Sequence, residues 1–600
     1  VKAAAVIGRE FEVPILSEVM YNQSEFANHN NYHTILNEQI VIAEENQIWR
    51  AMNEMRYIFK HSLLREAVYD MQLRSRLKEI HFLIGVAIEK IYVDRIEDRY
   101  EDLAFHYEKA ENTEKTIYYL RKSADKSRKK YQNLQAIEFY DKLIKYLDVE
   151  NLVENKVNIL LKKATLQEQI GQWDKSMHTC NMALLLAESN HLTLQIGRIK
   201  NTLGNLYLLK GNYDSAKIIL ESALDIFIQK DDFKGLAIVN GNLGNLYFRQ
   251  GRYEEAKEYF IEAIQINKNY HFPTSAQLVA NLGLTYMNQN QFDLGIKCLS
   301  DQLNLTDGTN DTRSLAVLHT NIGIVYFEKG DFEMALDHYQ KGLEMSKMLG
   351  NQLLVSIALG CIGSVYERKG NYQKAMDLYF EDLEICQQLG DKQGISIALG
   401  LIGGLYSLQG AFDKAINYMN KNLDLCEKLN YRKGIAKALN VLGDIYFFLE
   451  KFDKSLEYYN LAIQKAKEID NKILIIASLV EKGEVLIAKE DLNGVAAVIA
   501  EAEAYHDMNL NKALHLDIEL LKAKLAVLKN DQTEAINLLN QLDQFATNDI
   551  EKAAIVYILW KLERKENHRQ LALALYTNLY AYTPKYLYKL RLNKLTFNQP

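Results

Sequence analysis

Three histidines near the start of the chain are the first residues whose chemistry has to be judged. His61, His81 and His106 are separated by 20 and 25 residues, and Glu66 follows His61 by five. Histidines that share a metal ion are commonly about three to five residues apart, and a general acid–base pair needs a cleft, for which nothing here argues. We therefore expect histidines that pack between helices with their ring nitrogens hydrogen-bonded.

A run of basic residues is the second candidate. The segment RKSADKSRKK at 121–130 holds six lysines and arginines, and could contact nucleic acid or an acidic partner. No aromatic platform accompanies it, and Glu97, Asp98, Glu101 and Asp102 lie upstream as partners for its charges. We expect the solvated face of a helix.

Motifs for phosphate binding or nucleophilic catalysis are absent from the sequence. It has no glycine-rich loop ending in Lys-Ser or Lys-Thr and no Gly-x-Ser-x-Gly, and the metal-binding aspartates of a cyclase cannot be placed. The cysteines are scattered, with no two within three residues of each other: Cys180, Cys298, Cys361, Cys386 and Cys426. They indicate reduced thiols rather than disulfides or a zinc site. We predict no enzyme activity, no cofactor and no metal for this chain.

The composition is that of a folded protein built from long helices. Of 600 residues, 48% are hydrophobic and 25% charged, and only four are proline, which breaks helix interiors. The net charge of −7 gives no electrostatic reason to expect nucleic acid or a membrane as partner. No apolar run reaches the length of about 18 residues that a membrane span requires. With the reduced cysteines, this favours a cytoplasmic protein.

The length needs a further explanation, because 600 residues are too many for one ordinary core. A chain of this size is either several domains or an array of repeats. Its first residue is Val1 rather than methionine, so we also expect it to be part of a longer protein.

Glycine recurs at a fixed interval through most of the chain. Eight glycines, which we call the anchor glycines, are separated by 39 or 40 residues: Gly204, Gly244, Gly283, Gly323, Gly363, Gly403, Gly443 and Gly483. A tyrosine follows three residues after each of the first seven, and Leu486 takes that place in the eighth. A small or polar residue lies seven after each anchor, and a ring follows two further on in all but the last. Bulky residues lie sixteen after the anchors: Leu220, Phe260, Leu299, Tyr339, Tyr379, Met419, Tyr459 and Ile499.

A glycine inside a helix has to be offset by something else. Each costs roughly 1 kcal/mol against alanine, so eight would cost on the order of 8 kcal/mol, comparable to the net stability of a whole domain. Close approach of a neighbouring helix, which only a residue without a β-carbon permits, is the natural compensation. We predict that the second small residue ends one helix, that the ring begins the next, and that small and bulky residues fit between the paired helices.

This order of residues resembles the tetratricopeptide repeat. The usual period of that repeat is about 34 residues, whereas the period here is 40, as in the longer-helix varieties of Pins-type polarity adaptors, kinesin light chains and some bacterial regulators. The proline expected at the end of each repeat is absent. The resemblance implies an all-α superhelical solenoid of paired helices. Degenerate repeats extend it, so we assign repeats of about 40 residues to 151–545, capping helices near 550–565 and 569–594 to the segment 546–600, and degenerate helical repeats to 96–150.

The first 95 residues follow no such interval. The segments at 2–16 and 57–89 resemble a winged-helix-like region that follows the P-loop ATPase in large bacterial signalling proteins of the STAND type, many of which also carry an adenylate or guanylate cyclase domain. The residues that carry this resemblance are Phe59, His61, Leu64, Glu66, Tyr69, Arg74, Arg76 and His81. Because no phosphate-binding loop occurs in this chain, the resemblance implies a parent protein rather than an activity.

The concave side of the solenoid is the better candidate site. In tetratricopeptide superhelices the first helix of each pair lines it, with positions three before the anchor and one, four and five after it projecting there. Our candidate peptide-binding groove consists of Asn201, Asn205, Asn245, Phe248, Arg249, Phe327, Arg368, Asn440, Asp444 and Phe447. Asparagines can bond an extended backbone, arginines can take acidic side chains, and phenylalanines add apolar area. The alternative is that these are merely positions that tolerate solvent.

Three functions follow in order of preference. The first is a scaffold for protein–protein interaction, the partner-docking or sensor region of a larger signalling protein, which binds a protein or peptide and no nucleic acid or membrane. The second is a regulatory part of a nucleotide-hydrolysing ATPase or cyclase. The third is part of a transcription regulator. Self-association stays open.

Overall fold

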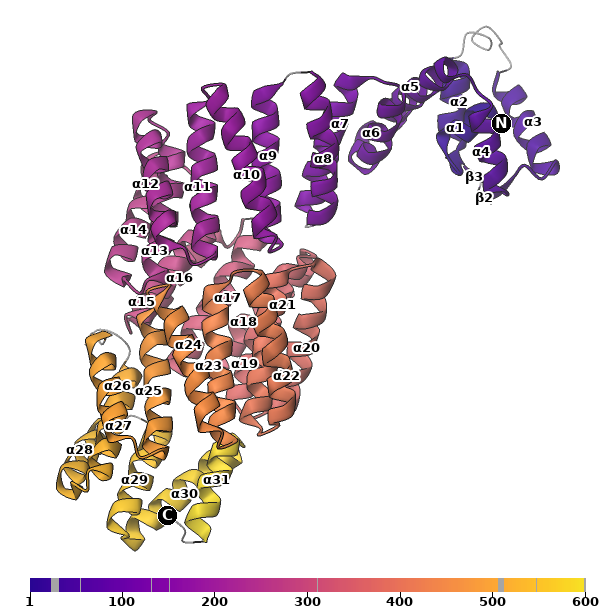
Figure 1. Ribbon diagram of the computed structural model, residues 1–600. Coiled ribbons are helices and arrows are strands. Elements are labelled where there is room, and N and C mark those ends of the chain that lie inside the picture. The colour runs from indigo at the N-terminus through magenta and orange to yellow at the C-terminus, as the bar shows by residue number, and fades with distance from the viewer. Residues whose placement is uncertain are drawn as a thin grey trace. The chain divides into compact units, whose positions relative to one another are not determined.

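The computed structural model describes the chain apart from residues 23–31, 54, 131, 151, 310, 506–511, 547 and 598–600. It divides into two compact units, Val1–Leu166 and Gln167–Pro600, which are described separately (Figure 1). No helix in the described ranges is both long and apolar enough to cross a membrane.

The first unit opens with a small mixed fold. Its helices and short strands follow in the order α1 (Lys2–Ile7), β1 (Glu10–Glu12), α2 (Val13–Tyr21), α3 (Tyr32–Glu45), β2 (Trp49–Asn53) and β3 (Arg56–Phe59). The strands form an antiparallel sheet in the order β1-β3-β2, with Phe11 opposite Tyr57 and Trp49 opposite Phe59. Phe11, Trp49 and Phe59 are almost fully buried and pack edge-on, so aromatic contacts hold this sheet to its helices.

Helices complete the first unit. They are α4 (Ser62–Asp70), α5 (Arg74–Ile91), a 3₁₀ turn η1 (Val93–Arg99), α6 (Tyr100–Lys109), α7 (Thr113–Lys129), α8 (Asn133–Val149) and the start of α9 (Val153–Gln169). A β-carbon placed on Gly85 of α5 would lie 2.6 Å from the ring of Tyr107 on α6. The close fit of glycine against tyrosine therefore begins before the regular repeats do.

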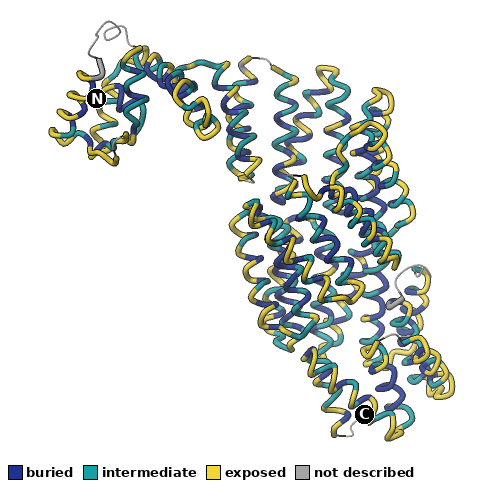
Figure 2. Tube along the Cα trace, turned by 180° about the vertical axis from the view of Figure 1, so that it is seen from behind, coloured by how far each residue is buried: buried dark blue, intermediate teal, exposed yellow. Residues whose placement is uncertain are grey.

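The second unit is a series of helix pairs. The first helices of the pairs are α11 (Thr193–Leu209), α13 (Phe233–Arg249), α15 (Ala276–Asn288), α17 (Thr312–Lys329), α19 (Gln352–Arg368), α21 (Lys392–Leu408), α23 (Arg432–Phe448), α25 (Lys472–Ala488) and α27 (Lys512–Leu528). The second helices are α10 (Trp173–Ser189), which follows α9, α12 (Tyr213–Gln229), α14 (Tyr253–Asn269), α16 (Phe292–Thr306), α18 (Phe332–Met348), α20 (Tyr372–Leu389), α22 (Phe412–Lys428), α24 (Phe452–Lys467), α26 (Leu492–Tyr505) and α28 (Gln532–Phe545). Buried residues follow the faces along which these helices meet (Figure 2).

Local residues set where each helix begins and ends. Asn371 caps α20 by accepting a hydrogen bond from the backbone N–H of Lys374, and Asp391 caps α21 in the same way through Gln393. Between the helices of a pair the chain passes through a left-handed residue, as at Gly370 with a φ of 72°. Where glycine is missing from that position, Glu450 adopts the same conformation with a φ of 58°. The expectation that the second small residue ends the first helix is therefore confirmed. The left-handed conformation is kept even where another residue replaces the glycine.

The anchor glycines are where the helices of a pair touch. A β-carbon on Gly363 would lie 2.5 Å from the ring of Tyr379, and one on Gly204 would lie 2.5 Å from Leu220. Both partners are the bulky residues sixteen positions after the anchor, so the predicted fit of small against bulky residues is confirmed. It fails at Gly483, whose close neighbour is Leu521 of the next first helix instead of Ile499.

The curvature of the solenoid puts the first helices on its inner side. Each of them contacts the next, from α11 against α13 through to α25 against α27. Within the part of the chain that the structure describes, no two successive second helices make a comparable set of contacts. Helices that crowd one another lie on the shorter, inner arc, so the first helices form the concave face. The predicted all-α superhelical solenoid is confirmed.

The solenoid winds far enough for one turn to touch the next. Trp173 of α10 packs edge-on against Tyr431, with ring centroids 5.9 Å apart. Ile469, between α24 and α25, is buried in the same cluster as Leu208 and Tyr213 of α11 and α12. These contacts join segments more than two hundred residues apart, and no local pattern predicts them.

Three helices follow the last pair: α29 (Asp549–Glu563), α30 (Glu566–Tyr582) and α31 (Tyr586–Thr596). The expected single helix at 569–594 is wrong, because Pro584 separates α30 from α31. Tyr586 packs between Phe412 and Phe448, at ring distances of 5.2 and 5.8 Å. These helices therefore follow the end of the array and also pack against the ends of helices in earlier pairs.

Candidate functional site

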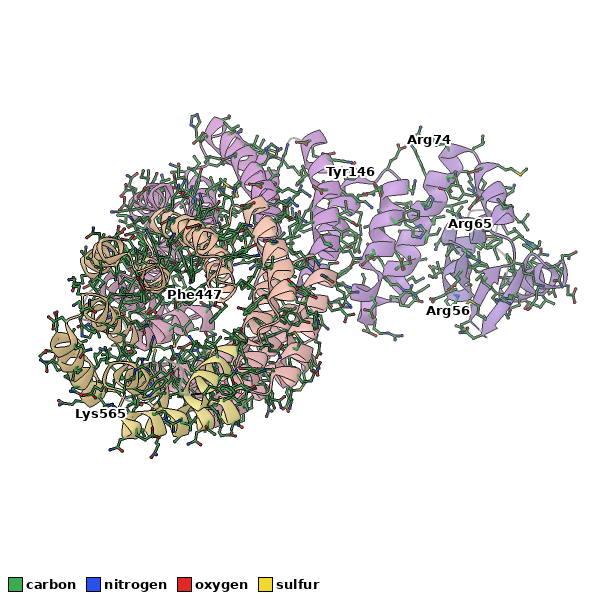
Figure 3. All side chains as sticks on the ribbon, turned by 60° about the horizontal axis from the view of Figure 1, so that its bottom comes forward. Arg56, Arg65, Arg74, Tyr146, Phe447 and Lys565 are labelled. Carbon is green, nitrogen blue, oxygen red and sulfur yellow. The ribbon has the colours of Figure 1, made fainter. Side chains whose placement is uncertain are left out.

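Five positions on each first helix make up the inner surface. They lie ten, six and three residues before the anchor glycine and one and four residues after it, a spacing that keeps them on one helical stripe. On α23 these positions are Lys433, Lys437, Asn440, Asp444 and Phe447. Figure 3 places Phe447 toward the middle of the ring of helices. We call these positions the inner surface. The name also covers the residue five after each anchor and the two nearby carboxylates Glu481 and Asp517.

The predicted asparagines of the earlier helices bond to other side chains of the protein. Asn205 donates to the carboxylate of Glu168 at 2.7 Å. Asn201 accepts from Asn242 on α13, and Asn245 accepts from Asn281 on α15. These bonds link neighbouring first helices, so each amide keeps only part of its capacity for a ligand.

Asn440 differs from those three asparagines. Its side-chain Oδ1 is buried and has no hydrogen-bond partner among the residues that the structure describes. A buried acceptor without a donor costs free energy, about 1–3 kcal/mol where water cannot reach it. An N–H group from a bound molecule would satisfy it.

The predicted phenylalanines form small aromatic contacts at the ends of their helices. Phe248 packs on Tyr253, Phe327 on Phe332 and Phe447 on Phe452, with ring centroids 5.6 to 6.1 Å apart. In each case the partner is the ring that begins the second helix. The three phenylalanines are only half-buried, so part of each ring stays open to solvent.

Arg368 lies in a different setting from Arg249. Its guanidinium stands 5.8 Å from the centre of the Phe327 ring. Burial lowers the pKa of Lys585, the residue just before α31, and the charge of Arg368 is the second cause of this shift. Arg368 is therefore flanked by the C-terminal helices.

Three cations gather where α13 faces the start of α23. Burial and, to a smaller extent, the charges of Lys437 and Arg249 together lower the pKa of Lys433 to about 8. The pKa of Lys437 is also lowered, by the desolvation that comes with the surrounding protein, although its side chain still reaches solvent. Within the described ranges no carboxylate forms an ion pair with any of the three. They form a cationic cluster whose residues come from two turns of the solenoid.

Carboxylates gather on the adjoining part of the inner surface. Burial raises the pKa of Asp444 to about 7, although the hydroxyl of Tyr459 donates to it at 2.6 Å. Burial, with the charges of Asp444 and Glu484, raises the pKa of Glu481 well above its usual range. Burial also raises the pKa of Asp517 to about 6. The side chain of Glu481 reaches solvent, but three helices surround it, and this confinement explains the shift.

Apolar side chains and bare backbone lie on the neighbouring helices. Ile357 of α19 and Ile397 of α21 are 45% and 48% exposed, both six residues before their anchors. A β-carbon placed on Gly404 of α21 would meet no atom within 4 Å. Exposed isoleucines beside open glycine are suited to an apolar side chain of a ligand.

The candidate residues of the groove thus divide into groups. Arg249, Asn440, Asp444 and Phe447 belong to the part of the inner surface on α13 and α23, where the charge of Arg249 acts on Lys433. Phe327 and Arg368 form a pair on α17 and α19, whereas Asn201 and Asn205 lie on α11.

Sequence reasoning missed several of the residues that make this surface distinctive. Lys433, Lys437, Ile357 and Ile397 lie ten or six residues before their anchors. Extending the helical stripe by two turns from the position three before the anchor would have found them.

The remaining candidates lie away from the inner surface. Nδ1 of His81 is 2.9 Å from Nδ1 of His106, and its Nε2 is 3.0 Å from the hydroxyl of Tyr69. Burial lowers the pKa of His81 to about 4, so these are neutral packing histidines, as expected. His61 precedes α4 and is exposed, so the expectation of a histidine packed between helices is wrong for this residue. In the basic run, Lys126 pairs with Asp98 at 3.4 Å.

A metal site finds no support in the described part of the chain. It holds no group of three or more histidines, cysteines, aspartates or glutamates suited to a metal ion. The five cysteines are free thiols.

The periodic segment matches a known family. Models of the tetratricopeptide repeat match residues 197–227, 237–270, 275–348, 354–428 and 436–467. These stretches contain the anchor glycines from Gly204 to Gly443, and the matched stretches are tetratricopeptide repeats. No curated protein matches the chain.

Solved structures share the helical architecture at low identity. A Rap protein complexed with competence and sporulation factor is 14% identical, with a TM-score of 0.41 over 60% of this chain and 99% of that one. The apo quorum sensor NprR from B. thuringiensis is 19% identical, with a TM-score of 0.38 over 59% and 100%. A STAND protein with a tetratricopeptide repeat sensor from Pyrococcus horikoshii is 13% identical, with a TM-score of 0.39 over 79% and 65%. At these identities the likeness concerns the fold alone.

Proposed function

We propose that this chain is the interaction region of a larger cytoplasmic signalling protein and that it holds a peptide or protein segment against its inner surface. The observation that carries the proposal is the state of that surface. Cations without counter-charges, a buried acceptor on Asn440 and exposed isoleucines lie together on the concave side of a repeat solenoid. Each costs stability in the free chain, and each would be relieved by a ligand.

The ligand contacts that we propose differ between the groups of residues. Asn440 would accept an N–H from the ligand backbone, Arg249 would pair with an acidic group, and Phe248, Phe327 and Phe447 would add apolar contact. Asn201, Asn205 and Asn245 would use the donors and lone pairs that their bonds to neighbouring helices leave free. Arg368 would reach a ligand only beside α31.

The parent protein is proposed from the first unit. Helix, strand, two helices and two strands in the order α1-β1-α2-α3-β2-β3, with a sheet ordered β1-β3-β2, are compatible with a winged helix. With the resemblance at 2–16 and 57–89, this supports a STAND-type ATPase or cyclase-linked protein as the source of the chain. In that case the repeats would regulate a nucleotide-hydrolysing domain from outside it.

Titration with nucleotides separates this proposal from its enzymatic alternative. We expect no heat when ATP or GTP is added to the chain, because nothing in its sequence forms a phosphate-binding loop. Micromolar binding of either nucleotide would favour a retained part of an ATPase or cyclase site. A gel-shift titration at low and high salt, expected to be negative, addresses the role in transcription.

Selection from a random library of linear peptides tests binding directly. We expect the chain to enrich a set of related peptides. Hydrogen exchange with an enriched peptide bound should protect α13, α19, α21 and α23 more than the second helices that pack behind them. The proposal fails if no peptide is enriched, or if protection lies on the second helices.

A further inference from the structure

Helix α23 carries both signs of charge along one stripe. Lys433 and Lys437 are one turn apart near its start, and Asp444 lies seven residues beyond Lys437. At a rise of about 1.5 Å per residue, the cations stand about 10 and 16 Å from the carboxylate along the helix axis. Opposite charges at such distances on one confined surface do not neutralise each other by contact.

Neighbouring helices enlarge both charged regions. Arg249 of α13 adds a third cation beside Lys433, and Glu481 of α25 and Asp517 of α27 add carboxylates around Asp444. When ionised, the two regions have opposite charge, and each crowds like groups together at a cost to the folded chain, which for the carboxyl groups appears as raised pKa values.

A nearby pair shows what the protein does when a counter-charge is in reach. Lys524 of α27 forms an ion pair with Glu484 of α25, across two first helices. Among the described residues no such pair joins Arg249, Lys433 or Lys437 to Asp444, Glu481 or Asp517. A ligand that carries both signs of charge would complete these pairs.

Apolar contact is available beside the charged regions. Ile397 and Gly404 lie on α21, which contacts α23 directly. A side chain between the two charged groups of a ligand can reach this apolar area. Asn440 lies between Lys437 and Asp444 on the same stripe, and a rotation of its side chain would bring the buried, unpaired Oδ1 to the ligand backbone.

We infer that the ligand of the inner surface is a peptide segment with an acidic and a basic group about three to five residues apart, the acidic group at Arg249, Lys433 and Lys437 and the basic group at Asp444 and Glu481. The spacing follows from the rise of about 3.3 Å per residue in an extended chain. This inference rests on the proposed function, and adds to it a charge pattern and the place of each charge along α23.

Parallel peptide selections on charge variants test the inference. Selection on the unchanged chain should enrich peptides with this spacing of acidic and basic residues. In Lys433→Gln/Lys437→Gln the enriched peptides should lose their acidic residue and keep the basic one, and in Asp444→Asn/Glu481→Gln the reverse should occur. Lys347→Gln and Glu344→Gln, at exposed positions of the second helix α18, are the matched controls and should leave the pattern unchanged.

The outcomes of this experiment separate the two proposals. Peptides enriched without the charge pattern, or with a pattern that the variants do not alter, would overturn the inference and leave peptide binding intact. Enrichment of no peptide at all would overturn both. Circular dichroism on each variant identifies one that has lost its fold, and single substitutions at Lys437 and Glu481, whose side chains are exposed, then replace it.

Discussion

The two faces of the first helices differ in how completely their side chains are packed and paired. On the face toward the second helix, anchor glycines meet bulky side chains at distances that leave no room for a methyl group, as at Gly363 and Tyr379. On the inner surface, Gly404 faces open space, and among the described residues Oδ1 of Asn440 has no hydrogen-bond partner and Lys433 and Lys437 have no ion pair. One face is complete in the free chain and the other is not. The contrast is the reason that we propose the function for the incomplete face, since the stability of the solenoid does not explain its residues.

The largest effect should come from filling an anchor position. Gly363→Leu would push its side chain into Tyr379 and separate α19 from α20, at a cost of about 3 kcal/mol or more. Hydrogen exchange should rise in that pair and its two neighbours, because a solenoid transmits strain only to adjacent repeats. A uniform rise across all repeats would contradict the contrast.

Gly404→Ala is the matched control on the opposite face. It should stabilise the chain by up to about 1 kcal/mol, since alanine is a better helix former and no atom obstructs its methyl group. The sign of the change in thermal midpoint distinguishes the two faces. Equal destabilisation by Gly404→Ala and Gly363→Ala would mean that the faces do not differ.

Loss of the contact between successive turns of the solenoid should have the next largest effect. Ile469 is buried against Leu208 and Tyr213, so Ile469→Ala should cost about 2–4 kcal/mol. Its distinctive effect should be faster hydrogen exchange in α11 and α12, which are remote in sequence. Leu349→Ala, at the same place three repeats earlier, should leave exchange in α11 and α12 unchanged. If both variants act only locally, the turns are not held together at this point.

The pH dependence of stability tests the acidic part of the inner surface. The pKa of Asp444 is about 7 in the folded chain against an ordinary value of 3.8, so the folded state keeps a proton that the unfolded state releases. The stability due to that proton is present in acid and is lost as the pH rises through about 7. Between about pH 5 and 8 the thermal midpoint should therefore fall less in Asp444→Asn than in the unchanged chain.

The expected size of that difference is on the order of 1 kcal/mol, reduced from the full shift because the surface retains access to solvent. Asparagine can still accept from the hydroxyl of Tyr459, so the variant should fold. Parallel pH profiles for the two proteins would show that the carboxylate is not confined as described.

How far the sequence predicts this molecule depends on the range of the interaction. The pairing of helices followed from residues sixteen positions apart, such as Gly363 and Tyr379, because a helix interior tolerates glycine only for a packing reason. The contact of Trp173 with Tyr431 could not be foreseen, since superhelical pitch depends on small rotations that add up over several repeats. Repeats that lose the pattern are also less predictable, as the shift of the Gly483 contact to Leu521 illustrates.

The candidate groove was predictable only in part for a related reason. The resemblance to tetratricopeptide superhelices, together with helical periodicity, placed Asn440 and Asp444 on the concave side. Whether Asn201 or Asn245 was free to bind a ligand depended on neighbours about forty residues away, Asn242 and Asn281. The cationic cluster needed the stacking of turns, because Arg249 and Lys433 are on helices five pairs apart.

The most direct test of the account is the affinity of one enriched acidic peptide for two single-lysine variants. Lys437→Gln removes a cation of the inner surface, and Lys347→Gln removes an exposed one from α18. We predict that titration calorimetry finds binding to Lys437→Gln weakened about tenfold or more, as for the loss of a charge-assisted bond, with Lys347→Gln unaffected. Equal affinity for the two variants would contradict the assignment of function to the inner surface.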